Sequence, residues 1–135
     1  MRASSRAVVI EDGKLLTMFR RKIKDNNVKE YYVIPGGGID EGETSKGTVV
    51  RELQEEMNVD INILGFITQK TTDTTIEDYW HCEIVSGTPQ LGGEELERMT
   101  EENYYEPRWV KIEDLENLDF TGLDVVELAL NKEYK

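Results

Sequence analysis

The sequence predicts an α/β fold in which helices cover both faces of a mixed β-sheet. Two observations support this prediction. Short segments of apolar or alternating residues, typical of strands, recur along the 135-residue chain. Two segments with helical spacing separate them, one after the third predicted strand and one near the C-terminus. Strands that alternate with helices favour a sheet packed on both sides, and this length favours one domain, residues 1–135.

The first part of the chain predicts three strands. Arg6–Ile10 and Lys14–Arg20 are β-prone, and the Asp-Gly pair between them is typical of a tight turn. The polar segment Arg21–Glu30, with two asparagines at its centre, predicts a loop. Tyr31–Ile34 predicts a third, short strand that leads into a proline and three glycines.

The remainder of the chain predicts two helices and three further strands. The first helix is expected to begin close to Glu43 or Thr44, and Ser86–Asn103 predicts a loop. The last helix is indicated by apolar residues at helical spacing. The predicted helices are Ser45–Met57 and Leu123–Leu130, and the predicted strands are Ile61–Thr68, Ile76–Val85 and Tyr105–Ile112.

Three carboxylates share one narrow face of the helix predicted over Ser45–Met57. Seen from Glu52, Glu55 lies about 60° to one side and Glu56 about 40° to the other. Like charges at this spacing destabilise a helix unless something neutralises them. A hard divalent cation with oxygen ligands is the simplest counter-charge, and Mg²⁺ is the usual one where phosphates are handled. The adjoining face predicts a core-facing stripe of Val49, Val50, Leu53 and Met57.

The stretch from Gly37 to Val59 resembles the Nudix box, Gly-x5-Glu-x7-Arg-Glu-U-x-Glu-Glu-x-Gly-U, in which U is aliphatic. One position departs from the box, because Asn58 stands at its last glycine. Asn is the residue that best replaces Gly in a left-handed position past a helix end. The flanking segments Tyr31–Gly38 and Glu106–Leu115 also look like this family, so the resemblance covers nearly the whole chain. The matching box residues are Gly37, Glu43, Arg51, Glu52, Leu53, Glu55, Glu56 and Val59.

The resemblance implies the Nudix fold, which is an α/β/α sandwich with a mixed β-sheet. It also implies a pyrophosphohydrolase that depends on Mg²⁺, for which Mn²⁺ can substitute. Its substrate would be a nucleoside diphosphate derivative. The classes left open are nucleoside triphosphates, including oxidised dNTPs, nucleotide sugars and dinucleotides.

The same resemblance assigns roles to the box residues. Glu52, Glu55 and Glu56 are expected to hold the metal, and Gly36 to add its backbone carbonyl. Arg51 is expected to orient a carboxylate through a charge-assisted hydrogen bond, the alternative being a surface ion pair with Glu55. The general base is expected to be a box glutamate or an acid from a later loop.

The base and the substrate contacts are predicted from residues outside the box. Among the later acids, Glu95 and Glu97 are our candidates for the base, and a carboxylate base predicts activity that rises towards alkaline pH. Arg6 and Arg20 lie near predicted strand ends, where they would meet phosphate oxygens, and Tyr32 would stack on a base. Charged strand ends on the surface and aromatic packing are the alternatives for these residues.

Composition argues against several other classes of protein. The chain has 28 acidic and 16 basic residues and a formal net charge of −12, which disfavours binding to polymeric nucleic acid. Cys82 is the only cysteine, so no intrachain disulfide is expected, which suits the cytoplasm. No apolar run approaches the ~20 residues needed to span a membrane. The expected partner is a small nucleotide, and a homodimer is compatible with the resembled family, in which homodimers are common.

Two other functions remain open from the sequence. A Nudix domain that senses a nucleotide without cleaving it is the main alternative, although a sensor has no need for the complete acidic set. An isomerase of allylic diphosphates would need a reactive cysteine in its pocket, and Cys82 lies on a predicted strand with no flanking signal. Metal-dependent turnover separates hydrolysis from sensing, and the products separate it from isomerisation.

Overall fold

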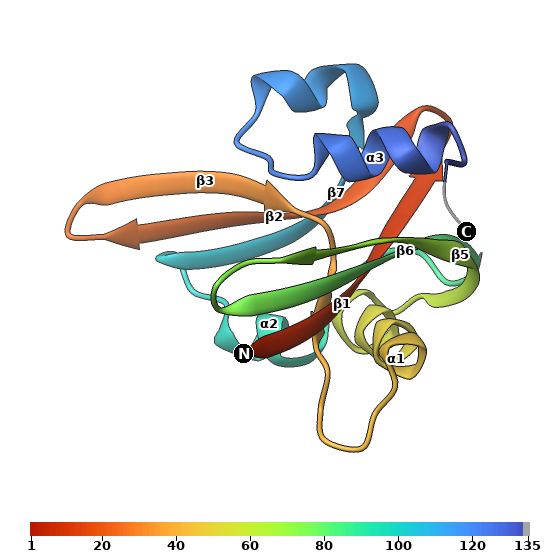
Figure 1. Ribbon diagram of the computed structural model, residues 1–135. Helices are drawn as coiled ribbons and strands as arrows, with labels where there is room; N and C mark the ends of the chain where they lie inside the picture. The colour runs from red at the N-terminus through yellow and green to blue at the C-terminus, as the bar shows by residue number, and fades with distance from the viewer. Residues whose placement is uncertain (134–135) are drawn as a thin grey trace.

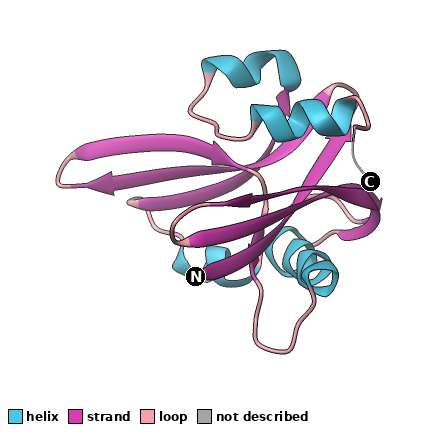
Figure 2. Ribbon diagram, viewed as in Figure 1, coloured by secondary structure: helices cyan, strands magenta, loops and turns pink. Residues whose placement is uncertain are grey.

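The protein is a mixed β-sheet between two helical layers, seen here in a computed structural model that describes residues 1–133 (Figures 1 and 2). One layer holds the helices α1 and α2, and the other holds α3 and a short 3-10 helix, η1. This arrangement confirms the predicted α/β/α sandwich. In chain order the elements are β1 Arg2–Glu11, β2 Lys14–Lys24, β3 Asn27–Val33, β4 Gly36–Gly38, α1 Ser45–Met57, β5 Asp60–Thr71, β6 Thr75–Ser86, α2 Gly93–Arg98, β7 Asn103–Lys111, η1 Ile112–Asn117 and α3 Leu123–Leu130.

The sheet has the strand order β3-β2-β1-β6-β5, and β4 and β7 branch from it. The strands β1 and β6 are parallel, and the other pairs are antiparallel. The glycines of β4 pair with Ser4, Ser5 and Arg6 of β1, while β7 pairs with β2 along nearly its whole length. This topology brings the glycine turn that precedes α1 against the middle of the sheet.

Each face of the sheet has its own apolar core. The residues Val49, Leu53 and Met57 of α1 are fully buried against one face, and Val125 and Val126 of α3 are buried against the other. The predicted stripe on α1 is therefore confirmed at three of its four positions. The fourth prediction is wrong: Val50 is 38% exposed, because it lies at the edge of the stripe where the helix turns towards solvent.

The loop predicted for Arg21–Glu30 is wrong. The strand β2 continues to Lys24, and β3 starts at Asn27. Between them Asp25 and Asn26 both have positive φ, at 53° and 66°, which is the backbone of a tight hairpin turn. The hairpin extends beyond the helical layers (Figure 1), so most of its side chains meet water and the segment shows no apolar pattern.

The loop predicted for Ser86–Asn103 contains a helix that the sequence did not indicate. The helix α2 spans only Gly93–Arg98, and none of its residues is buried, so it has no apolar stripe to detect. The predicted strands are all present, and several are longer than expected at their ends. None of the helices within residues 1–133 is long and apolar enough to cross a membrane.

Candidate active site

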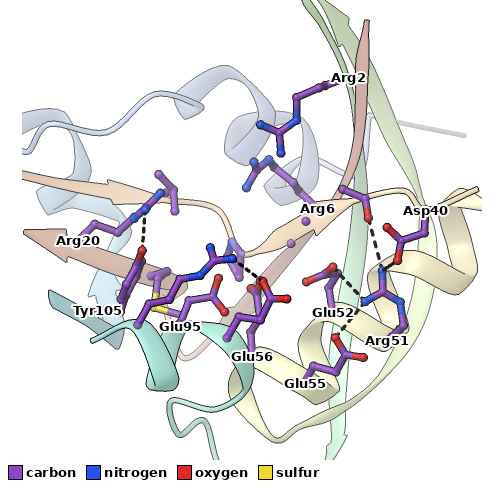
Figure 3. Close-up of a pocket in the computed structure, with 18 residues that line it drawn as sticks. Arg2, Arg6, Arg20, Asp40, Arg51, Glu52, Glu55, Glu56, Glu95 and Tyr105 are labelled. Atoms are coloured by element: carbon purple, nitrogen blue, oxygen red, sulfur yellow. Dashed lines mark hydrogen bonds and ion pairs between the residues drawn. The ribbon is translucent and has the colours of Figure 1, made fainter. Parts of the chain in front are cut away.

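A cavity of about 560 Å³ lies between the β4 glycines, α1 and α2, and it is lined by charged side chains of both signs (Figure 3). We call its acids the acidic wall and four of its arginines the basic wall. A volume of this size is ordinary for a small-molecule site. The acidic wall is Asp40, Glu52, Glu55, Glu56, Glu94 and Glu95, and the basic wall is Arg2, Arg6, Arg20 and Arg98.

The ends of α1 are fixed by two polar residues. Thr44 is the N-cap, and its hydroxyl oxygen accepts from the backbone N–H of Gly47 at 3.0 Å. Asn58 ends the helix in the left-handed region, with φ 56° and ψ 36°. The box position that usually holds glycine is therefore left-handed here too, as predicted, and Asn adopts it at a modest cost.

Gly37 brings the glycine turn against the buried acid of α1. A Cβ at Gly37 would lie 2.5 and 2.6 Å from the two carboxylate oxygens of Glu52, closer than any side chain tolerates. Glu52 is 9% exposed. Glycine at this position lets the backbone lie directly over the Glu52 carboxylate, which any larger residue would displace.

Arg51 holds several carboxylates at the edge of the cavity. Its Nε donates to Oε2 of Glu43 at 2.6 Å and its Nη2 to Oε1 of the same group at 2.9 Å. Its Nη1 lies 3.1 Å from Glu52 and 2.9 Å from Glu55. The predicted orienting contact and the alternative ion pair with Glu55 are thus both present. The two hydrogen bonds from Arg51 lower the pKa of Glu43 to about 2, and the same pairing raises the pKa of Arg51.

Glu56 is a half-buried acid with acidic neighbours. Burial is the main cause that raises its pKa to about 10, and the nearby carboxyls of Glu52 and Glu95 raise it further. Glu95 comes from α2, whose approach is fixed by two backbone bonds to the end of α1. The N–H of Gln90 donates to the carbonyl of Met57 at 3.0 Å, and that of Gly92 to the carbonyl of Glu56 at 2.8 Å.

The acidic wall offers carboxylate oxygens, the donors that a hard cation prefers. Within residues 1–133, no three His, Cys, Asp or Glu side chains converge closely enough to hold a metal ion, and Arg51 takes up the carboxylates of Glu52 and Glu55. Oxygen donors are nevertheless what Mg²⁺ prefers. The partial burial and acidic neighbours that raise the pKa of Glu56 also mark a place where negative charge lacks a counter-ion. By its chemistry, and not by its present geometry, this set of carboxylates suits a divalent ion.

The other predicted site residues are divided between the cavity and its surroundings. Glu95 lines the cavity, whereas Glu97 is exposed and does not. Arg6 lines it, but its Nε donates to Glu77 at 3.0 Å. Gly36 and Arg20 also line it. Tyr32 does not, and its hydroxyl accepts from Arg108 at 3.0 Å.

Several cavity residues were missed at the sequence level, among them Arg2, Asp40, Arg98 and Tyr105. Arg2 lies at the start of β1, beyond the strand predicted from Arg6. Arg98 is on α2, where it donates to Glu94 at 3.1 Å. Tyr105 faces the cavity from β7. The Glu94–Arg98 spacing of four residues is the one available signal for α2.

Comparisons with known proteins identify the family. The family model of the NUDIX domain matches residues 1–128. No curated protein matches the chain.

Several solved structures have the same fold. An ADP-ribose pyrophosphatase from Streptococcus suis superposes with a TM-score of 0.70 at 18% identity, covering 99% of this chain and 92% of that one. A MutT NUDIX hydrolase from Burkholderia pseudomallei superposes with a TM-score of 0.68 at 18% identity, covering 96% of this chain and 95% of that one. The E. coli ORF135 protein superposes with a TM-score of 0.67 at 18% identity, covering 98% of this chain and 91% of that one. At these identities the likeness concerns the fold, and together with the family match it shows that the chain belongs to the NUDIX family of hydrolases.

Proposed function

We propose that this protein is a Mg²⁺-dependent pyrophosphohydrolase that cleaves the diphosphate linkage of a nucleoside diphosphate derivative. The observation that supports it most is the meeting of Glu52, Glu56 and Glu95 in one cavity under the Gly36–Gly38 turn. An acid such as Glu56, whose pKa is raised by burial and by neighbouring carboxyls, is costly for a fold and typical of functional sites. The Nudix box, which departs from the family pattern only at Asn58, stands at the same place.

The proposed ligands of the ion are the carboxylates of Glu52, Glu55 and Glu56 and the backbone carbonyl of Gly36. When bound, Mg²⁺ would neutralise negative charge on the phosphate oxygens. Arg51 holds Glu52 and Glu55 beside the cavity through ion pairs of 3.1 and 2.9 Å.

We assign the general base to Glu95, with Glu97 as its matched control. Glu95 lines the cavity on the side facing Glu56, whereas Glu97 is exposed outside it. As the oxygen of water bonds to phosphorus, its proton passes to the Glu95 carboxylate and the bridging P–O bond breaks. The products are a nucleoside monophosphate and the phosphorylated remainder.

The fold is shared by proteins that are named for different substrates. The similar structures include one titled an ADP-ribose pyrophosphatase and one titled a MutT hydrolase, and their likeness to this chain is nearly equal. The choice between substrates must therefore come from side chains of the cavity.

The hydrolase proposal is tested by turnover of a substrate panel. Nucleoside triphosphates, oxidised dNTPs, ADP-ribose, nucleotide sugars and dinucleotides are each incubated with Mg²⁺ and with EDTA, and the products are separated. We expect metal-dependent cleavage that Glu56→Gln lowers by orders of magnitude. Lack of cleavage across the panel, with a nucleotide still raising the melting temperature, would instead support the sensing function.

The assignment of the base is tested by two variants of α2. Glu95→Gln is expected to lower kcat and to flatten the rise of rate with pH, since the amide accepts no proton. Glu97→Gln removes the same charge from the same helix outside the cavity and should retain the wild-type profile. Equal losses in the two variants would contradict the assignment.

A further inference from the structure

Most arginines around the cavity are already paired with acids. Arg6 binds Glu77 at 3.0 Å, Arg98 binds Glu94 at 3.1 Å, and Arg51 binds several carboxylates. Arg2 and Arg20 differ from them, since no ion pair joins either to an acid within residues 1–133. Arg2 is exposed at the start of β1, whereas Arg20 is half-buried on β2. Its charge faces the cavity without a protein counter-charge.

The side chain of Arg20 is nevertheless held in place. Arg20 lies on β2, directly across from Tyr31 on β3 and Tyr105 on β7. Its guanidinium carbon is 5.5 Å from the centre of the Tyr31 ring and 4.8 Å from that of Tyr105. Its Nη2 donates to the Tyr105 hydroxyl at 3.1 Å (Figure 3). Two aromatic neighbours and one hydrogen bond therefore fix the group before any ligand arrives.

The hydrogen-bonding capacity of this guanidinium is not used up. Its Nε–H is buried and has no acceptor, and a buried donor without an acceptor destabilises the structure that contains it. Guanidinium stays charged at all accessible pH values, and its planar fork matches the oxygens of a phosphate. An anionic ligand group in the cavity would supply the missing counter-charge.

Arg20 lies away from the proposed cleavage centre. In Figure 3, Arg20 and Arg51 stand on opposite sides of Glu52, Glu56 and Glu95. In the proposed function, the diphosphate that is cleaved lies at these acids. A group of the same molecule that reaches Arg20 therefore lies beyond the cleaved diphosphate, and the unpaired charge of Arg20 favours an anion there.

We propose that Arg20 binds a phosphate beyond the cleaved diphosphate, so that the preferred substrates carry at least three phosphates, as nucleoside triphosphates do. This inference rests on the proposed hydrolase function. A substrate with only two phosphates, such as ADP-ribose or a nucleotide sugar, leaves Arg20 without its anion. Arg20 is thus a specificity-determining residue.

The test compares two substrates within one preparation. The values of kcat/KM for a nucleoside triphosphate and for ADP-ribose are measured for the wild type and for Arg20→Gln. Hydrogen bonds to charged groups are strong enough that their loss should lower the triphosphate to ADP-ribose ratio about tenfold or more. The ratio does not depend on the folded fraction, so poor folding of the variant cannot imitate the result.

A neighbouring lysine provides the matched control. Lys22 is two residues further along β2, on the same side of the strand, exposed and outside the cavity. Lys22→Gln removes the same charge and should leave the ratio unchanged. Equal effects of Arg20→Gln on both substrates, or a wild type that prefers ADP-ribose, would overturn the inference while the hydrolase proposal stands.

A binding measurement separates this inference from the hydrolase proposal. Inorganic tripolyphosphate is titrated into the protein in EDTA by calorimetry, so that turnover plays no part. We expect weaker binding by Arg20→Gln and wild-type binding by Lys22→Gln. Equal binding by the wild type and Arg20→Gln would overturn the role of Arg20. A protein that shows the expected binding but cleaves nothing would retain that role and lose the proposed hydrolysis.

Discussion

Arg51 links the acids of the site to the turn before α1. It binds Glu43 through two hydrogen bonds and also contacts Glu52, Glu55 and the carbonyl of Gly38. Its guanidinium therefore fixes acids that come from the turn and from the helix. We infer that Glu43 acts by orienting Arg51, and not by touching substrate.

Glu43→Gln is expected to lower turnover about 10- to 100-fold, the usual effect of removing a residue that orients metal ligands. The amide cannot pair with Arg51 as a charged group, so Arg51 would shift towards Glu52 and Glu55. Steady-state kinetics at saturating Mg²⁺ checks this. Full activity in the variant would show that Arg51 is oriented without Glu43.

The lowered pKa of Glu43 also predicts how stability depends on pH. Its ionised form stabilises the fold above the ordinary pKa of 4.5, and this contribution is lost as the pH falls towards about 2. The melting temperature of the wild type should therefore exceed that of Glu43→Gln at pH 7, and the difference should shrink by pH 3. A difference that is the same at both pH values would contradict the pairing.

The raised pKa of Glu56 predicts the opposite dependence of stability on pH. With its pKa raised to about 10, Glu56 in the metal-free fold is expected to keep a proton that the unfolded chain releases above 4.5, so stability should decline as the pH rises from about 4.5 towards about 10. Glu56→Gln mimics the neutral acid and should lack this decline. In EDTA, the variant should become the more stable protein as the pH is raised from 7 to 10. Melting temperatures that change with pH in the same way for the two proteins would show that Glu56 is ionised in the metal-free fold.

The end of α1 is joined to the segment that carries Glu95. Asn58 has a left-handed backbone, and its side-chain amide donates to the carbonyl of Gln90 at 3.4 Å. Beside it, a Cβ at Gly92 would lie 2.7 Å from the carbonyl oxygen of Glu55. Close backbone packing and not the asparagine side chain therefore sets how α2 approaches α1.

Asn58→Gly is expected to change the free energy of unfolding by less than about 1 kcal/mol. Glycine relieves the left-handed backbone, but it loses one long, exposed hydrogen bond and gains freedom in the unfolded chain. Gly92→Ala should be clearly more destabilising, because backbone atoms must move to admit its Cβ. Urea denaturation measures both. A loss above about 2 kcal/mol for Asn58→Gly would mean that its side chain holds the segment in place.

The regular elements of the fold could be predicted from sequence where burial leaves a pattern. The bounds Ser45–Met57 and Leu123–Leu130 are confirmed because each helix buries one apolar stripe. The hairpin around Asp25 and Asn26 was mistaken for a loop because it projects into solvent. The exposed α2 was missed for the same reason.

The candidate site likewise contains residues that could be predicted from the sequence and residues that could not. The box acids were predicted because they recur within two helical turns of one segment. The isolation of Arg20 from every acid depends on strand pairing between β2, β3 and β7, which no local pattern contains. A formal charge of −12 likewise gives no hint that a basic wall faces the acids. The arginines collect there because distant segments meet at one cavity.

The most direct test of the acidic wall is binding of Mn²⁺, used as a paramagnetic probe of the proposed Mg²⁺ site. Electron paramagnetic resonance counts free Mn²⁺ during titration of the wild type, Glu56→Gln and Glu97→Gln. We predict saturable binding by the wild type and Glu97→Gln, and at least about tenfold weaker binding by Glu56→Gln. Binding by Glu56→Gln equal to that of the wild type would contradict the assignment of the acidic wall as the metal site.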